Sequence, residues 1–185
     1  MREKWINLNG EWEFSEDYSE KILVPFPPES SLSGIGRRME KDKLLFYRRS
    51  FTLPDGFIKS RLIINFGAVD QEADVLINGN KAGRHEGGYL PFSFDITDLI
   101  KNGENEITVI AKDTLDKKYP YGKQKENRGG MWYTPVSGIW QSVWLESLPE
   151  DPILSIKIEQ NSKFAKIRVN SEAEYKILKL HFDGS

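Results

Sequence analysis

The sequence predicts an all-β protein whose main part is a sandwich of two sheets. Apolar and polar residues alternate with a period of two along many short segments, as they do in strands that bury one face. Helical periodicity is nearly absent, and turn-forming residues separate the alternating segments. Hydrophobic residues make up 38% and charged residues 29% of the 185 residues, which is typical of an ordered globular protein.

The first expected strands lie in the N-terminal third of the chain. Apolar residues alternate with asparagines over residues 6–9 and with glutamates over residues 11–14. Residues 44–53 are β-prone and end at Pro54-Asp55-Gly56, a turn sequence. Residues 61–66 form the next apolar segment, and we expect a strand there.

A hairpin is predicted in the middle of the chain. Apolar residues alternate over residues 73–77, and Asn78-Gly79 follows at once. Both central positions of a type I′ turn need positive φ, which Asn and Gly tolerate. Residues 81–85 are therefore expected to return antiparallel to residues 73–77.

Two more strands flank a short polar segment. We expect a strand over residues 90–95 and another over residues 107–112, where apolar and polar residues again alternate. Residues 96–100 between them fit a single helical turn, capped by Asp95 or Thr97.

Residues 113–138 have no clear period and contain four glycines and two prolines. Irregular segments of this length are uncommon inside compact domains, and they are often functional. Residues 140–148 then resume as a strand, which would place Trp140 and Trp144 on the same face.

Two domains are predicted, over residues 1–149 and residues 150–185. The closely spaced Pro149 and Pro152 indicate a linker, because proline stiffens the chain. A complete sandwich of the immunoglobulin type needs about seven strands. The second part is therefore expected to be incomplete, with about three strands, over residues 156–159, 165–169 and 178–182.

Two long motifs stand in the first 149 residues. The first is Phe66-Gly67-Ala68-Val69-Asp70 with Ala73 to Gly79 and Gly87-Gly88-Tyr89, and the second is Gly129 to Glu146. Together they resemble glycoside hydrolase family 2, which includes β-galactosidases, β-glucuronidases and β-mannosidases. The similarity covers nearly all of residues 1–149 and is to the amino-terminal, galactose-binding-like jelly-roll domain of that family. The tail after Pro152 resembles the start of the family's second, immunoglobulin-like sandwich.

The resemblance implies a retaining mechanism with two carboxylates, both in a TIM barrel that follows the two sandwiches. No barrel pattern is present, so we expect no catalytic residue in this chain and no hydrolysis by it alone. The implied reaction of the longer enzyme is cleavage of terminal β-glycosides, with β-galactosides first and β-glucuronides second. We expect no cofactor in this chain, and the metal requirement of the longer enzyme, Mg²⁺ or Na⁺, stays open.

The resemblance also implies that the irregular segment projects toward the barrel and helps to shape the substrate pocket. Asp113 stands where some relatives carry an Asn or Asp near the sugar. Lys123 and Gln124 could orient a sugar by hydrogen bonds, and Trp132 and Tyr133 offer a stacking face. These five residues are the candidate substrate contacts.

Other sites are disfavoured by the residues themselves. The chain has no cysteine, and its histidines, His85 and His181, lie far apart, so no metal site is expected. The pair Asn105-Glu106 matches the family's acid/base dipeptide, but it lies in a polar segment that we interpret as a solvated turn. No phosphate-binding glycine loop precedes a helix, and the formal net charge of −2 disfavours a nucleic-acid partner.

The expected partners are a carbohydrate substrate and the barrel of the longer enzyme, with a homo-oligomer as a further option. No membrane partner is expected, because no segment is apolar enough to cross a bilayer. The start of the chain has no signal-peptide pattern, and with the lack of cysteine this favours the cytoplasm. Two alternatives stay open: a free-standing carbohydrate-binding module and an oligomer-assembly domain.

Overall fold

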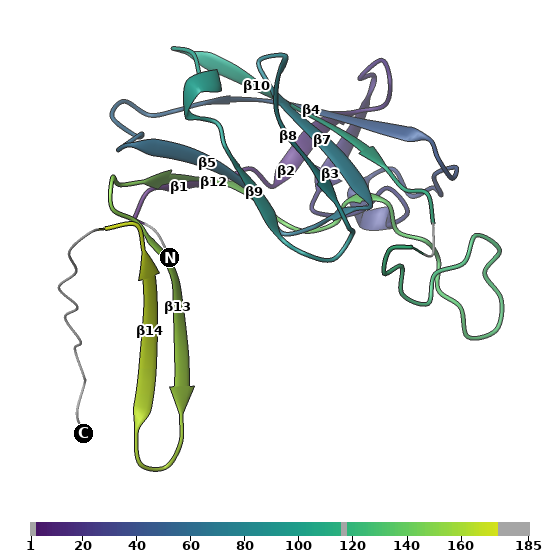
Figure 1. Ribbon diagram of the computed structural model, residues 1–185. Helices are drawn as coiled ribbons and strands as arrows, with labels where there is room; N and C mark the ends of the chain where they lie inside the picture. Colours follow the sequence, from purple (N-terminus) through teal and green to yellow (C-terminus); the bar gives the residue numbers. More distant parts are fainter. Residues whose placement is uncertain (1–2, 116–117, 174–185) are drawn as a thin grey trace.

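The computed structural model describes residues 3–115 and 118–173, and it is an all-β structure (Figure 1). The prediction of the fold class is confirmed. The elements are β1 (Trp5–Asn7), β2 (Gly10–Phe14), β3 (Glu20–Val24), the 3₁₀ turn η1 (Ser31–Ser33), β4 (Leu44–Thr52), β5 (Arg61–Phe66), β6 (Val69–Asp70), β7 (Glu72–Ile77), β8 (Asn80–Glu86), β9 (Phe92–Asp95), the 3₁₀ turn η2 (Thr97–Leu99), β10 (Glu104–Lys112), β11 (Gly138–Ile139), β12 (Val143–Leu148), β13 (Ile153–Gln160) and β14 (Ala165–Ser171).

The strands of the main domain form two antiparallel sheets that lie face to face (Figure 1). One sheet has six strands in the order β3-β2-β4-β10-β7-β8, and the other has four in the order β1-β12-β5-β9. The short pair β11-β6 lies outside both sheets. Within the described ranges no helix is long and apolar enough to cross a membrane.

The core lies between the two sheets and follows from the alternation along the strands. In β10, Ile107, Val109 and Ala111 are fully buried, and the residues between them are half-buried. Fully burying a side chain such as that of Ile stabilises the fold by about 1.5–3 kcal/mol. The indole of Trp12 is also buried, and its Nε1 donates to the Leu8 carbonyl at 2.8 Å, so its polar atom is satisfied.

The hairpin predicted at Asn78-Gly79 joins β7 to β8. Asn78 has φ of +52° and Gly79 has φ of +80°, as a type I′ turn requires. The Asn78 side chain also donates to the Leu99 carbonyl and to Asn105 Oδ1, each at 2.8 Å. The turn is therefore tied to η2 and to β10 as well as to its own strands.

Three segments differ from the expectations. The strand expected over residues 140–148 is interrupted, because β11 ends at Ile139 and β12 begins at Val143. Trp140 lies in the interruption, where its Nε1 donates to the Gly88 carbonyl at 2.8 Å. Strand β3 and turn η1 have no counterpart in the sequence analysis. The single turn Thr97–Leu99 is 3₁₀, and its N-cap is Ile96 with no side-chain cap hydrogen bond, instead of the expected Asp95 or Thr97. Asp95 Oδ1 accepts from the Thr97 amide at 3.0 Å.

Strands β13 and β14 form a two-stranded hairpin that projects away from the sandwich (Figure 1). Two of the three expected tail strands are thus present, and the one expected over residues 178–182 lies outside the described residues. An ion pair of 2.6 Å joins Arg61 of β5 to Glu172 beside the end of β14. Much of the hairpin's apolar surface is exposed, at Ile153, Leu154, Ile156, Ile158 and Phe164.

Candidate functional site

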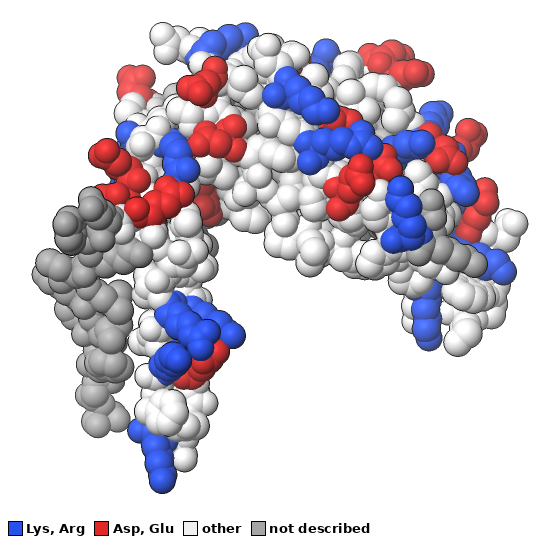
Figure 2. All heavy atoms as spheres, in the orientation of Figure 1, with Lys and Arg blue, Asp and Glu red and all other residues white. Residues whose placement is uncertain are grey.

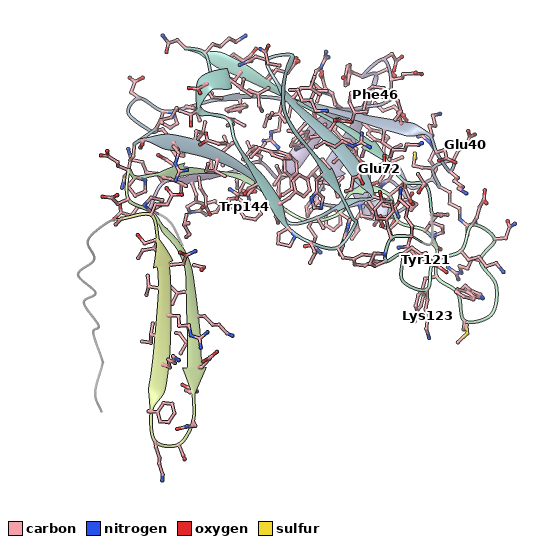
Figure 3. The ribbon with its side chains drawn as sticks, in the orientation of Figure 1. Glu40, Phe46, Glu72, Tyr121, Lys123 and Trp144 are labelled. Atoms are coloured by element: carbon pink, nitrogen blue, oxygen red, sulfur yellow. The ribbon has the colours of Figure 1, made fainter. Side chains whose placement is uncertain are left out.

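The irregular segment 113–137, which joins β10 to β11, is the candidate site, and we call it the long loop. It protrudes from one end of the sandwich, and Figure 3 shows Tyr121 and Lys123 on its protruding part. Asp113 starts the loop: its Oδ1 accepts from the Leu115 amide at 2.8 Å, and its carbonyl accepts from the Asp42 amide at 2.9 Å. The first turn of the loop is therefore fixed by the carboxylate of its first residue.

Gln124 anchors the middle of the long loop. Its side chain is buried, and its Oε1 accepts from the Val136 amide at 2.6 Å. Its Nε2 donates to the Tyr89 hydroxyl at 3.2 Å. Both polar groups of this amide are thus used inside the protein, as buried polar groups require.

Ser137 closes the long loop against the segment that precedes η1. Its hydroxyl donates to Glu29 Oε1 at 2.5 Å, and its amide donates to Glu29 Oε2 at 3.2 Å. Gly138 follows with φ of +71°, and a Cβ built on it would lie 2.0 Å from the Tyr47 hydroxyl. Only glycine fits this position, because both the backbone conformation and the space exclude a side chain.

Three carboxyl groups meet beneath the ends of the long loop: Glu29, Asp70 and Asp113. Burial raises the pKa of Asp70 to about 7, and the negative charges of Asp113 and Glu29 add to this rise, while a hydrogen bond from Gln124 opposes it. Burial also raises the pKa of Asp113 and of Glu29. Within residues 3–115 and 118–173, none of the three forms an ion pair with Lys or Arg.

The sequence analysis did not single out Asp70 as a site residue. The signal in the sequence was weak: Asp70 directly follows the apolar Ala68-Val69 within a motif, but an acidic residue is seldom fully buried. The structure places it in β6 with 4% of its surface exposed. A Cβ on Gly88 would lie 2.3 Å from Asp70 Oδ1, so the backbone at Gly88 must approach the carboxylate closely.

The five candidate substrate contacts are not all in one place. Gln124 and Trp132 line one open cavity of about 330 Å³. Asp113 lines a different, small cavity of about 40 Å³ together with Glu29 and Ser137. Lys123 and Tyr133 are exposed and pair through their backbones, with the Tyr133 amide donating to the Lys123 carbonyl at 2.7 Å. The larger cavity is completed by Lys41, Leu115, Tyr121, Lys125 and Glu126.

The Asn105-Glu106 pair has a structural role, but not the one expected of a solvated turn. Asn105 is buried, and its Oδ1 accepts from the Lys101 amide at 2.9 Å. Its Nδ2 donates to the carbonyls of Lys101 and Gly103. Glu106 lies in strand β10 and faces Arg48 at 3.9 Å. Asn105 thus stabilises the turn before β10, and it is buried where the sequence analysis expected it to be exposed.

No group of three or more His, Asp or Glu residues in the described part of the chain could hold a metal ion. His85 stacks on Phe92 with ring centroids 4.1 Å apart, and its Nε2 is 3.0 Å from the Gly87 carbonyl oxygen. His181 lies outside the described residues.

The chain belongs to glycoside hydrolase family 2. The family model described as "Glycosyl hydrolases family 2, sugar binding domain" matches residues 36–149, which include strands β4 to β12 and the whole long loop. The β-galactosidase of Thermoanaerobacter pseudethanolicus is 30% identical over 154 residues, which cover 81% of this chain and 20% of that protein. The human β-glucuronidase is 24% identical, covering 88% of this chain and 32% of that protein.

Solved structures agree on the fold. A β-glucuronidase from an uncultured Clostridium species superposes with a TM-score of 0.73 at 24% identity. The match covers 95% of this chain and 35% of that one. A β-glucuronidase from Ruminococcus gnavus gives a TM-score of 0.71 at 25% identity. The chain therefore spans about a third or less of the relatives named here.

Proposed function

We propose that this chain is the non-catalytic N-terminal part of a family 2 enzyme that hydrolyses terminal β-glucuronides, with β-galactosides as the second substrate class. The proposal rests mainly on one observation: the sandwich anchors the long loop at three points and leaves its aromatic tip exposed. This sandwich matches the family's sugar-binding domain. The order of substrates expected from the sequence, β-galactosides first, is not supported, because most of the relatives are named β-glucuronidases.

We further propose the two-domain division at residues 149 and 150. The family match ends at residue 149, and β13 and β14 form a separate two-stranded sheet. In this proposal residues 150–185 are a linker and the first strands of an immunoglobulin-like sandwich. A cytoplasmic location and a homo-oligomeric assembly stay predictions of the sequence.

The long loop is proposed to help shape the substrate pocket of the longer enzyme. Trp132, Tyr133 and Lys123 would contact the sugar, because their side chains are exposed. Gln124 would form the wall behind them. Asp113 would act as a positioning residue, since its carboxylate is buried and already accepts from the Leu115 amide. Its substitution by Ala is expected to weaken the loop and thereby lower kcat/KM of the longer enzyme.

The proposal is tested by reading the source gene beyond Ser185 and assaying both products. We expect about 250 or more further residues with alternating strands and helices. The longer protein should cleave aryl β-glucuronides faster than aryl β-galactosides, and the 185-residue chain should cleave neither. A stop codon directly after Ser185, or hydrolysis by the short chain, would contradict the proposal. A longer protein that prefers β-galactosides would restore the order expected from the sequence.

A further inference from the structure

We propose that the cavity beneath Trp132 binds a monosaccharide ring that carries a carboxylate, that is, a uronic acid. The proposal rests on the proposed function for the substrate class, but its test uses the 185-residue chain alone. The argument has three parts: the size of the cavity, its aromatic wall and the charge of the long loop.

The cavity is large enough for one sugar ring. Its volume is about 330 Å³, and pockets for small ligands run from about 300 to 1,000 Å³. Leu115, Tyr121 and Trp132 supply apolar walls, while Lys41, Lys125 and Glu126 supply charged groups. Gln124 forms a wall whose polar atoms are already used by Val136 and Tyr89.

Trp132 provides the stacking surface, because 37% of its surface stays exposed beside the cavity. Its amide donates to the Gly129 carbonyl at 3.3 Å, and the next residue pairs with Lys123. The backbone around the indole is therefore fixed before any ligand binds. Lys125 Nζ lies 5.7 Å from the indole centroid, so a positive charge stands next to the stacking surface.

The long loop is basic in an otherwise acidic chain. Residues 113–137 contain five Lys or Arg and three Asp or Glu, so they carry a net charge of +2. The whole chain carries −2, which leaves −4 for the remainder. Figure 2 shows Lys and Arg gathered at the protruding end of the loop, whereas red and blue mix over much of the sandwich.

Three basic side chains in the described part of the loop have no carboxylate partner among the described residues. Within residues 3–115 and 118–173, no carboxylate oxygen forms an ion pair with Lys123, Lys125 or Arg128. On the sandwich, by contrast, Arg84 pairs with Asp74 and Glu72. A cluster of like charges without a partner costs free energy, and an anionic ligand would offset that cost.

The mixture of charges in the cavity favours an acidic sugar over a bare anion. Phosphate or sulfate would leave both the Glu126 carboxylate and the indole without a favourable contact. A uronic acid has a carboxylate for Lys41 and Lys125, hydroxyl donors for Glu126 and a C–H face for Trp132.

The test compares methyl β-D-glucuronide with its neutral counterpart, methyl β-D-glucoside, by NMR titration of the 185-residue chain. We expect millimolar affinity for the glucuronide, about five-fold tighter than for the glucoside, which is the range of an exposed charge contact. This preference should weaken as salt rises toward about 1 M, because screening acts on exposed charges. Perturbed signals should come from Lys125 and Trp132.

Three variants sharpen the result. Trp132→Ala should abolish binding of both sugars, and Lys125→Gln should remove the preference for the glucuronide while keeping weak binding. Lys163→Gln is the matched control, because Lys163 is an exposed lysine in the turn of the hairpin β13–β14. Thermal melting of each variant shows whether the fold is intact.

Two outcomes would overturn the inference. One is the absence of binding at about 50 mM glucuronide, which corresponds to less than about 2 kcal/mol of affinity. The other is equal binding of the two sugars, or an equal loss of preference in Lys163→Gln. Neither result bears on the gene beyond Ser185, so failure here is distinguishable from failure of the proposed function.

Discussion

Single residues at the base of the long loop decide whether it is held in place. Asp70 and Asp113 are buried and Glu29 is half-buried near them, with no cation paired to the three carboxyl groups in the described part of the chain. Burying carboxylates together is unfavourable when all are charged, and a group in this position keeps its proton to a higher pH. The base of the loop therefore contains Asp70, whose pKa is raised to about 7, and two further carboxyl groups, Asp113 and Glu29, whose pKa values burial also raises.

Asp70 should make the stability of the chain depend on pH. Its pKa is about 7 in the folded chain against a usual value of 3.8. The folded state thus holds a proton that the unfolded state loses, and stability should fall as pH rises from about 4 to about 7. Asp70→Asn should stabilise the chain by about 1–3 kcal/mol at pH 8 and flatten the profile. Urea unfolding at pH 5 and pH 8 measures both.

Asp151→Asn is the control for that prediction, since Asp151 is an exposed carboxyl in the linker. It should leave the pH profile unchanged. If Asp70→Asn destabilised the chain equally at both pH values, the buried carboxyl would not be the source of the pH dependence.

At the scale of elements, short strands and the breaks between them determine where the end of the long loop lies. Strand β11 has two residues and pairs only with β6, at Gly138↔Asp70 and Ile139↔Val69. This register brings the end of the long loop next to the buried Asp70. The break after Ile139 lets Trp140 turn toward the Gly88 carbonyl instead of continuing the strand.

Gly138→Ala should destabilise the chain strongly, by about 2–4 kcal/mol. The φ of +71° disfavours any side chain there, and the added Cβ would lie 2.0 Å from the Tyr47 hydroxyl in the core. Gly129→Ala is the matched control, because a Cβ at Gly129 would meet no atom within 4 Å. Equal melting temperatures for the two variants would show that this joint is not specific for glycine.

At the scale of the whole molecule, the sandwich and the hairpin β13–β14 are separate units of packing. The hairpin leaves Ile156, Ile158 and Phe164 exposed, and an exposed apolar ribbon with open edges tends to associate. Its one described ion pair with the sandwich, Arg61 with Glu172, is exposed and stabilises little.

Truncation after Pro152 should therefore leave the sandwich folded. We expect its melting temperature to change by less than about 4 °C, which corresponds to less than about 1 kcal/mol. Sedimentation should show less self-association for the truncated chain than for the full chain at the same concentration. A large loss of stability would mean that the hairpin contributes to the core of the sandwich.

Much of the fold could be predicted from local pattern. The apolar segment 61–66 and the alternation over residues 73–77 predicted strands β5 and β7, whose observed bounds agree to within one residue. A strand that buries one face has apolar side chains at every second position, so it can be recognised from the sequence. Strand β3 was not predicted, because Glu20–Val24 is short and is followed directly by a proline-rich segment that obscures the alternation.

The sequence by itself determined most of the strands, the Asn78-Gly79 turn and the long irregular segment, because these depend on side-chain periodicity and on local backbone preferences. The order of the strands in the two sheets comes from the tertiary structure. It also determined the motifs that place the chain in its family. Tertiary structure alone decided the site. Glu29, Asp70 and Asp113 come from three distant segments, and only the packing of β6 against β11 and the long loop brings them together. The separation of Asp113 from the cavity of Trp132 is also a matter of packing, since burial and contact depend on segments far apart in the chain.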